Sequence, residues 1–455
     1  MRYVSTRGDA PAVGFEGALL AGLAPDGGLY VPETWPALDR DLHGLDYAET
    51  AAAVLAPFTA GALDEAALLA MAKEVYAGFD HPATTPLVQV GPDRWMMELF
   101  HGPTLAFKDC AMQLLGRLFE TVLARRGERL TIVGATSGDT GAAAVAALAG
   151  LESVDVAILH PLDRVSPVQR RQMTTVTAPN VTNIAVQGTF DDCQDLVKAM
   201  FADRPFADAM RLGGINSINW ARIAAQAVYY AFAATRLQGP VHFVVPTGNF
   251  GNVFAGYVAK RLGLPIGRLV VATNVNDILA RFFQSGGTYA AEGVQATLSP
   301  SMDIQVASNF ERALFEAHGR DAAAVRGLMA RFKQSRSFTV EADAFAELGR
   351  HFGAGRADEA ATVARLRWAA ANGLGVLDPH TAVGLEVALG LDLDGPVVTL
   401  ATAHAAKFPA AAEAANLALP PLPASMADLF EREERFTVLA NDLDTVEAHI
   451  RGAFR

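Results

Sequence analysis

The chain has 455 residues, of which 51% are hydrophobic and 19% charged, and its formal net charge is −12. This composition is typical of a globular enzyme with sizeable cores in two or three domains. The negative charge disfavours nucleic acid and anionic membranes as main partners, although a locally positive site can still bind an anionic substrate.

Cysteine content and apolar runs bear on the compartment. The chain has two cysteines, Cys110 and Cys193, too few for a disulfide framework, which favours a reducing compartment. The N-terminal residues lack the apolar stretch of a signal peptide, and no apolar run reaches the length of a membrane span. We therefore expect a cytoplasmic protein without a membrane partner. Its oligomeric state does not follow from the sequence.

The first 95 residues differ from the remainder of the chain. Proline and glycine are frequent up to Pro36, and a helical stretch follows over residues 51–77, interrupted by Pro57 and Gly61. We predict a separate N-terminal unit that ends near the segment 82–86.

Beyond this unit, short apolar runs alternate with helical segments. Strands are predicted at 130–133, 154–159, 183–186, 241–245, 269–273 and 397–401, and helices at 110–126, 142–149, 220–236 and 253–262. The strands are apolar throughout instead of alternating with polar residues. This pattern predicts an α/β fold with a parallel sheet covered on both faces.

Lys108 is the first candidate for chemistry. It follows the apolar residues Leu105, Ala106 and Phe107 in a loop that leads into a helix. A lysine in apolar surroundings is poorly hydrated, so its pKa falls and its neutral amine can attack a carbonyl. By itself the pattern is weak, because most lysines at a helix start are solvated surface charges.

Two glycine-rich loops, residues 134–141 and 246–252, each follow a predicted strand and precede a helix. Small residues, unpaired backbone amides and the positive end of a helix dipole favour anion binding there. Neither loop matches a P-loop or a dinucleotide fingerprint. The alternative is that these glycines only permit tight turns. A lysine combined with an anion site that lacks nucleotide motifs favours pyridoxal phosphate as cofactor.

Longer motifs spread over nearly the whole chain make the interpretation more specific. They are residues 3–8 (YVSTRG), 101–109 (HGPTLAFKD), 134–141 (GATSGDTG), 216–222 (NSINWAR), 248–252 (GNFGN), 301–304 (SMDI), 378–384 (DPHTAVG) and 401–404 (ATAH). In these motifs and their order, the sequence resembles the threonine synthase family, part of the tryptophan synthase β-like group of pyridoxal-phosphate enzymes.

The resemblance implies the parallel-sheet, two-domain fold of that group with an extra N-terminal domain. The expected division is an N-terminal domain over residues 1–95, a smaller α/β domain over 96–237 and a larger α/β domain over 238–455. The smaller domain would hold the Schiff-base lysine and the loop for the substrate carboxylate. The larger domain would hold the loop for the cofactor phosphate.

The resemblance also implies roles for individual residues. Lys108 would be the catalytic residue and would hold pyridoxal 5′-phosphate as a Schiff base, and Thr402 would hydrogen-bond the pyridine nitrogen. The cofactor phosphate would be bound by Gly248, Asn249, Phe250, Gly251 and Asn252. No metal is expected.

The small-molecule substrate implied is O-phospho-L-homoserine, which has a carboxylate and a phosphate. Thr136 and Ser137 would bind the carboxylate, and Thr140, Asn216, Ser217 and Arg222 the phosphate, which needs a cation and hydroxyl donors. A lone arginine such as Arg222 is more often part of a structural ion pair, but the surrounding motif favours the phosphate role. Asp139 is expected to cap its helix or to position its loop.

The function implied is that of a lyase that converts O-phospho-L-homoserine and water to L-threonine and phosphate, the last step of threonine biosynthesis. The reaction is a γ-elimination followed by β-addition of water. Three alternatives stay open: a phospho-lyase of the same fold that releases 2-oxobutyrate, a hydroxyamino-acid dehydratase, and a non-catalytic anion-binding relative. Fold alone does not separate them.

Overall fold

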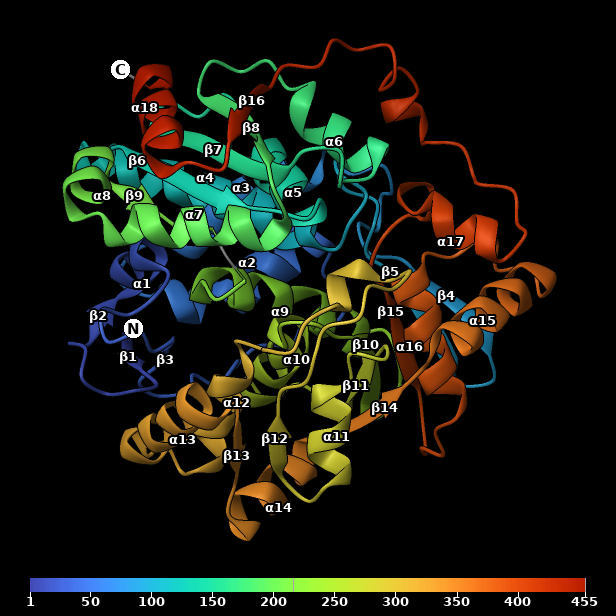
Figure 1. Ribbon diagram of the computed structural model, residues 1–455. Coiled ribbons are helices and arrows are strands. Elements are labelled where there is room, and N and C mark those ends of the chain that lie inside the picture. The colour runs from blue at the N-terminus through green and yellow to red at the C-terminus, as the bar shows by residue number, and fades with distance from the viewer. Residues whose placement is uncertain (216, 455) are drawn as a thin grey trace.

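Two mostly parallel sheets with helices around them form the body of the molecule (Figure 1). The computed structural model describes residues 1–215 and 217–454. The smaller sheet has the strand order β16 (Thr437–Ala440), β8 (Val181–Gln187), β7 (Val154–Pro161), β6 (Leu130–Ala135) and β9 (Leu212–Gly213). All of its strand pairs are parallel.

The larger sheet contains six strands. Their order is β14 (Phe352–Arg356), β11 (Ile266–Thr273), β10 (Val241–Pro246), β15 (Val397–Ala401), β5 (Arg94–Glu98) and β4 (Leu87–Gly91). Only β4 is antiparallel to its neighbour. Each apolar run predicted as a strand is a strand in one of the two sheets, and the predicted parallel pairing is confirmed, although the strands divide between two sheets where their pattern predicted one.

Four helices form a row of neighbours between the two sheets. They are α5 (Asp139–Leu148), α4 (Lys108–Arg126), α9 (Trp220–Ala234) and α10 (Gly251–Arg261), and each contacts the next in this order. Every residue of α9 is buried, which explains why this helix is apolar on all sides. The row connects the smaller sheet to the larger one.

The remaining helices surround the two sheets. Near the smaller sheet lie α6 (Pro167–Thr174), α7 (Phe190–Ala202), α8 (Arg204–Met210) and α18 (Leu443–Ala453). Near the larger one lie α11 (Ile278–Gln284), α12 (Phe310–Ala317), α13 (Ala322–Ser335), α14 (Ala342–His351), α15 (Glu359–Ala371), α16 (Pro379–Leu389) and α17 (Pro409–Ala414), with the strand pair β12 (Thr288–Ala290) and β13 (Ser337–Thr339). Short 3-10 helices are η1 (Pro300–Met302), η2 (Ala405–Lys407) and η3 (Ala424–Met426).

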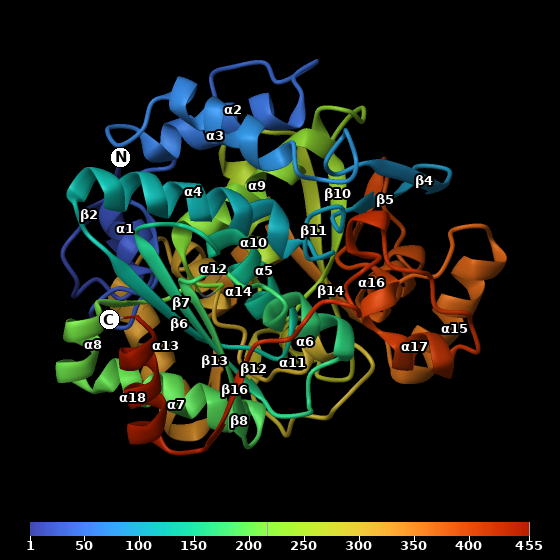
Figure 2. The same ribbon diagram turned by 90° about the horizontal axis from the view of Figure 1, so that it is seen from above.

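The N-terminal region has its own small sheet and three helices. Strands β1 (Arg2–Ser5), β2 (Val13–Gly14) and β3 (Tyr30–Pro32) pair antiparallel, and α1 (Phe15–Ala21), α2 (Tyr47–Thr59) and α3 (Glu65–Tyr76) complete the region. Helix α2 begins at a capping box of Asp46 and Glu49 and continues through Pro57 to Thr59. The interruption predicted at Pro57 is therefore wrong, whereas the one predicted at Gly61 lies in the break between α2 and α3. Figure 2 shows α2 and α3 at one edge of the molecule, beside α9, which α2 contacts.

The sheets do not follow the predicted domain boundaries throughout. Strand β5 crosses the boundary at residues 95 and 96 and pairs with β15 in the larger sheet, and β16, near the C-terminus, pairs with β8 in the smaller sheet. The division at 95 and 237 therefore stays a prediction, and the strands β5 and β16 pair with sheets on the other side of its boundaries. In the chain from residue 1 to 215 and from 217 to 454, no helix is long and apolar enough to cross a membrane.

Candidate active site

The row of four helices places their N-terminal ends around one site. Lys108 is the first residue of α4, Asp139 is the first of α5, Gly251 is the first of α10, and Arg222 is the third of α9. Helix N-termini have a partial positive charge and unpaired amides. The site is therefore suited to anions although the protein as a whole is acidic.

Lys108 is buried, with 7% of its surface exposed, and its Nζ donates to Oδ2 of Asp139 at 3.0 Å. Burial lowers the pKa of the Lys108 amine. The Asp139 carboxylate opposes this change, while the positive charges of Lys407 and Arg222 add to it. The amine thus loses its proton more readily than an ordinary lysine, as predicted from its apolar neighbours.

Asp139 is shared by two lysines. Its Oδ1 accepts a hydrogen bond from Gln169 Nε2 at 2.8 Å and lies 2.6 Å from Nζ of Lys407, which is completely buried. Burial by itself would raise the pKa of Asp139, but the charges of Lys108 and Lys407 hold it well below its usual range. The expectation that Asp139 caps its helix is wrong, because Gly138 occupies the N-cap and the carboxylate faces the lysines.

Lys407 was not predicted from the sequence. It lies between Ala405, Ala406 and Phe408, five residues after Thr402, and it belongs to η2. A lysine among apolar residues is the signal that singled out Lys108, so the same signal applied here would have found it. Its second partner is the carbonyl of Thr104, at 2.7 Å from Nζ.

The loop before Lys108 is fixed from two sides. The Asp109 carboxylate accepts hydrogen bonds from the backbone amide and the hydroxyl of Thr104, at 2.8 and 2.6 Å. Burial raises the pKa of Asp109 to about 6, although these hydrogen bonds oppose the change. The Phe107 amide donates to the carbonyl of Thr402 at 2.8 Å. Lys108 therefore begins its helix on a rigid turn beside Thr402.

The loop at residues 248–252 approaches other parts of the backbone closely. A Cβ on Gly248 would lie 2.6 Å from the carbonyl oxygen of Ser301, so a side chain does not fit there. Phe250 adopts a left-handed backbone (φ 63°) and its ring packs 5.2 Å from the rings of Phe310 and Phe352. Phe250 therefore faces the core with its side chain and can offer only its backbone to a ligand.

Asn252 leaves a donor without a partner. Its Oδ1 accepts hydrogen bonds from the hydroxyls of Tyr229 and Tyr230, at 2.6 and 2.8 Å, which orients the amide. Its Nδ2 is buried and has no partner among the described residues. The start of α10 also has no side-chain cap there, so its first amides remain available. These unpaired donors fit the phosphate of pyridoxal phosphate.

Thr402 lies at the end of β15, and a buried network holds it. Its amide donates to the Thr381 hydroxyl at 3.1 Å, and that hydroxyl donates to Asp378, which also binds Nδ1 of His380. The Thr402 hydroxyl itself has no hydrogen-bond partner in the part of the chain that the structure describes. It is therefore available as a neutral donor or acceptor.

The loop at residues 134–141 is shaped by Thr136. Its buried hydroxyl accepts hydrogen bonds from the amides of Gly138 and Gly141, at 3.0 and 2.9 Å. Gly138 has φ +144°, and a Cβ there would lie 2.5 Å from the Gln169 side chain. Ser137 is exposed and Thr140 half-buried. Ser137 and the loop amides are thus more accessible to a ligand than the Thr136 hydroxyl.

Arg222 has a buried positive charge with few protein partners. Only 2% of its surface is exposed, Nη1 donates to the carbonyl of Ile215 at 3.2 Å, and the buried Nε has no partner among residues 1–215 and 217–454. Burial lowers the pKa of its guanidinium to about 10. Ser217, five residues before Arg222, is half-buried, and its backbone carbonyl accepts a hydrogen bond from the side-chain amide of Asn309. Asn216 lies outside the described residues.

Asp303 belongs to the motif at residues 301–304, for which the sequence suggested no role. In the structure it joins neighbouring loop segments by hydrogen bonds. Its Oδ1 accepts hydrogen bonds from the amides of Asn274 and Asn276 at 2.8 and 2.9 Å, and from the Thr297 hydroxyl at 2.7 Å. The segment around η1 is thereby fixed to the end of β11. This placement also fixes the Ser301 carbonyl that faces Gly248.

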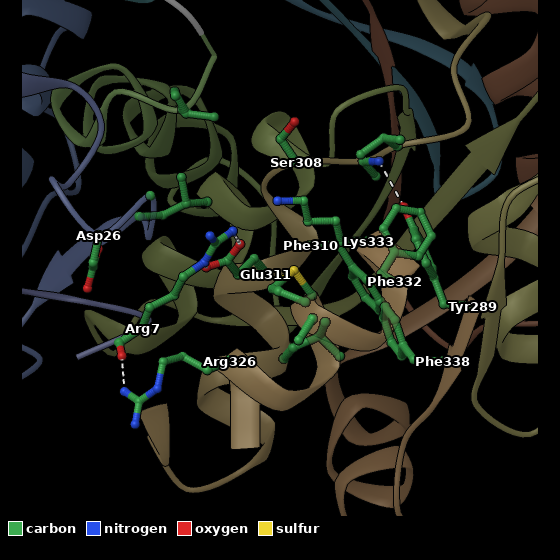
Figure 3. Close-up of a pocket in the computed structure, with 18 of the residues that line it drawn as sticks. Arg7, Asp26, Tyr289, Ser308, Phe310, Glu311, Arg326, Phe332, Lys333 and Phe338 are labelled. Carbon is green, nitrogen blue, oxygen red and sulfur yellow. Dashed lines mark hydrogen bonds and ion pairs between the residues drawn. The ribbon is translucent and has the colours of Figure 1, made fainter. Parts of the chain in front are cut away.

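A cavity of about 700 Å³ lies away from these residues, between the N-terminal sheet, α12 and α13 (Figure 3). Aromatic side chains of Tyr289, Phe332 and Phe338 line one side. On the other side Arg7 forms an ion pair with Glu311, 2.9 Å from Nη2 to Oε2. None of the described residues that line it is a predicted site residue. The cavity is therefore not the candidate catalytic centre.

Three family models match consecutive parts of the chain. The model described as "Threonine synthase N terminus" matches residues 2–76, "Pyridoxal-phosphate dependent enzyme" matches 79–331, and "Threonine synthase, C-terminal" matches 381–450. The second model crosses both predicted domain boundaries, at 95 and 237, so the three models do not correspond one to one to the three predicted domains.

Curated relatives match over nearly the full length. Threonine synthase of Pseudomonas aeruginosa is 52% identical, with 99% of this chain and 98% of the relative covered. Threonine synthase of Saccharomyces cerevisiae is 43% identical, with 92% and 89% covered.

Solved structures agree with this assignment. A pyridoxal-phosphate-bound threonine synthase from Brucella melitensis has a TM-score of 0.97 at 54% identity, with both chains fully covered. Threonine synthase from yeast has a TM-score of 0.93 at 38% identity, with 99% and 98% covered. The predicted fold and the predicted cofactor are confirmed. The chain belongs to the threonine synthase family and is a pyridoxal-phosphate-dependent lyase.

Proposed function

We propose that the substrate is O-phospho-L-homoserine, which the site converts with water to L-threonine and phosphate, the last step of threonine biosynthesis. Arg222 is the observation that carries this choice. A buried guanidinium without a carboxylate partner is costly unless an anion pairs with it. The substrate phosphate supplies that anion, and the hydroxyls of Thr140 and Ser217 supply further donors.

The cofactor phosphate would be held at the start of α10. The unpaired Nδ2 of Asn252, the first-turn amides and the close approach of the backbone at Gly248 support this placement. Lys108 would attach the cofactor, and the neutral hydroxyl of Thr402 would bind the ring nitrogen. Bound there, pyridoxal phosphate supplies an electron sink for charge that develops on the adjacent substrate carbons.

The remaining steps belong to the protein's own side chains. The Lys108 amine accepts the proton from Cα of the substrate and returns protons to the neighbouring carbons, because its lowered pKa suits it to act as a base. Ser137 and the amides of the 134–141 loop hold the carboxylate. Arg222 holds the phosphate before and after its bond to Cγ breaks, which favours departure of the anion.

Two measurements test the proposal together. Borohydride reduction followed by peptide mapping should place the pyridoxyl group on the peptide that contains Lys108, and Lys108→Ala should abolish turnover because attachment and base are lost. Incubation with O-phospho-L-homoserine should release threonine and phosphate in equal amounts.

Other outcomes would contradict the proposal. A label on Lys198 or Lys260 would mean that Lys108 is not the attachment site. Release of 2-oxobutyrate in place of threonine would identify a phospho-lyase of the same fold. Turnover of an unphosphorylated hydroxyamino acid in preference to the phosphorylated substrate would identify a dehydratase.

The cytoplasm is the compartment we propose. Cys110 and Cys193 are both free and buried in the structure, as is usual for a protein of a reducing compartment. Fractionation of the source cells with an antibody against the protein would test this, and recovery with an oxidising or membrane fraction would contradict it.

A further inference from the structure

Lys407 is a completely buried lysine to which the proposed reaction gives no role. Its ammonium has two partners, the carbonyl of Thr104 at 2.7 Å and Oδ1 of Asp139 at 2.6 Å. The other oxygen of that carboxylate, Oδ2, binds Lys108 at 3.0 Å. The two lysines therefore hold one carboxylate from opposite sides.

The charges of this group do not balance. Asp139 lies between two lysines, and Asp109 interacts with Lys407, so two carboxylates face the three cations Lys108, Lys407 and Arg222. Arg222 has no carboxylate partner among the described residues. Burying an excess positive charge is costly. A side chain that only filled space at this position would be apolar, so the ammonium of Lys407 calls for a reason beyond packing.

We infer that Lys407 is a positioning residue for Lys108: it anchors Asp139 from the far side and offsets part of the carboxylate's negative charge, so that the Lys108 amine gives up its proton more readily. Lys108 is then held in place by Asp139 yet free to accept a proton from the substrate. The inference rests on the proposed role of Lys108 as the base. Lys407 acts through Asp139 and is not placed in contact with substrate or cofactor.

The groups that face Lys108 agree with this role. Asp139 from α5 favours the protonated amine, whereas Lys407 from η2 and Arg222 from α9 disfavour it. Asp109 and His404 lie near Lys407, where the Lys407 charge lowers the pKa of both. Removing the Lys407 charge should therefore strengthen proton binding at the Lys108 nitrogen, and removing the Asp139 charge should weaken it.

A purely structural role for Lys407 makes a different prediction. If it only satisfied the Thr104 carbonyl, its loss would lower the stability of the turn before Lys108. The protonation of the Lys108 nitrogen would then stay where it is in the parent protein.

The test is a pH titration of the holoenzyme. The visible absorption of the cofactor attached to Lys108 reports protonation of the Lys108 nitrogen. In Lys407→Met the midpoint should rise by about one pH unit or more, and in Asp139→Asn it should fall by a similar amount. The acid limb of the kcat profile of Lys407→Met should move upward by the same interval.

Lys260→Met is the matched control. Lys260 is a half-buried lysine whose Nζ also donates to a backbone carbonyl, that of Gly267 at 2.9 Å. In Lys260→Met the midpoint of the pH titration should equal that of the parent protein. Far-UV circular dichroism of each variant shows whether it is folded. If Lys407→Met is not folded, Lys407→Gln, which keeps a donor for the Thr104 carbonyl but has no charge, takes its place with the same expected rise.

An unmoved midpoint in a folded Lys407→Met, or a midpoint that does not fall in Asp139→Asn, would overturn the inference. Borohydride mapping of the same samples separates this failure from that of the proposed function. Attachment at Lys108 with an unmoved midpoint counts against Lys407 alone. Attachment at another lysine counts against the proposed function, and the inference falls with it.

Discussion

Arg222 shows most clearly what a single residue adds to the sequence motif. From the sequence, an arginine at the start of an apolar helix fitted either a structural ion pair or a phosphate contact. In the structure it is buried, and among the described residues its Nε has no hydrogen-bond partner and no carboxylate forms an ion pair with it. An ion pair within that part of the chain is excluded, so the phosphate contact is the hypothesis that remains.

Arg222→Leu should separate substrate phosphate binding from cofactor binding. Loss of a charge-assisted hydrogen bond of about 1.5–3 kcal/mol predicts a fall in kcat/KM on O-phospho-L-homoserine of roughly ten- to a hundredfold or more. The cofactor absorption should stay. The spectral response to a small unphosphorylated amino acid, which does not use the contact, should change far less.

Arg312→Leu is the control for this prediction. Arg312 is also completely buried, but Nε and Nη2 donate to the carbonyls of Tyr30 and Ile218 at 3.0 and 2.6 Å. Its loss should lower the melting temperature and impair both ligands together. If Arg222→Leu behaves in the same way, Arg222 is structural and the substrate phosphate lies elsewhere.

At the scale of elements, the predicted helices were correct but the starts of three of them were late. The predictions began at residues 110, 142 and 253, whereas α4, α5 and α10 begin at Lys108, Asp139 and Gly251. Their N-caps are Phe107, Gly138 and Phe250, without a side-chain hydrogen bond, so the Ser, Thr, Asp or Asn that usually marks a helix start is missing.

These three helix starts, which lack a capping side chain, are among those that surround the candidate site. An uncapped start leaves the amides of the first turn unpaired, and an unpaired start can bind an anion. The loops and their chemistry were predictable from local sequence. That α5, α4, α9 and α10 lie side by side and bring their starts together depends on packing between distant segments, which local patterns do not contain.

Gly248→Ala should weaken pyridoxal phosphate binding. A Cβ at this position would lie 2.6 Å from the Ser301 carbonyl oxygen, so either the 248–252 loop or η1 must move. Because the loop amides would no longer converge on the phosphate, we expect the Kd of the cofactor to rise at least about tenfold. Fluorescence titration of the cofactor-free protein measures this.

Gly349→Ala is a cleaner control than a substitution at Gly263 or Gly267, the glycines that follow α10 in the chain. Gly349 lies inside α14, where an added Cβ would meet no described atom within 4 Å beyond its chain neighbours and the backbone of its own helix, whereas Gly263 has φ +94° and Gly267 would meet His242 at 2.7 Å. Gly349→Ala should leave cofactor affinity unchanged and stabilise α14 by about 0.5–1 kcal/mol. An equal loss of affinity in both variants would mean that the loop geometry is not the cause.

At the scale of the whole molecule, segments far apart in sequence complete each other's structure. Strand β16 joins the smaller sheet from the C-terminal region, and β5 joins the larger sheet from the N-terminal side. These strands are short, and their parallel partners, β8 and β15, are more than 200 residues away in the chain. Their pairing is set by tertiary packing, so sequence patterns predicted the parallel sheets but not which strands complete them.

The N-terminal region is likewise bound to the larger sheet's helices and does not stand apart. Glu311 of α12 accepts hydrogen bonds from the Thr6 hydroxyl at 2.6 Å and from Nε and Nη2 of Arg7 at 3.1 and 2.9 Å. Arg312, the next residue, donates to the Tyr30 carbonyl and to that of Ile218, beside Ser217. The N-terminal sheet thus supports the loop that precedes Arg222.

Glu311→Ala should loosen this connection and destabilise the whole molecule. The Glu311 side chain is 7% exposed, and its removal leaves Arg7 and Thr6 without their acceptor. We expect the free energy of unfolding in urea to fall by about 2–3 kcal/mol. Limited proteolysis should also cut within the first 35 residues sooner than in the parent protein.

The ion pair between Arg2 and Glu33, in the same N-terminal region, provides the control for Glu311→Ala. These side chains are 67% and 44% exposed and lie 3.6 Å apart, so solvent screens their attraction. Glu33→Ala should change the unfolding free energy by less than about 1 kcal/mol and leave the proteolysis pattern unchanged. If Glu311→Ala proves no more harmful than Glu33→Ala, the Glu311 contacts do not hold the N-terminal sheet. The position of that sheet must then depend on apolar packing alone, such as that of Tyr3 and Phe58 against Trp220.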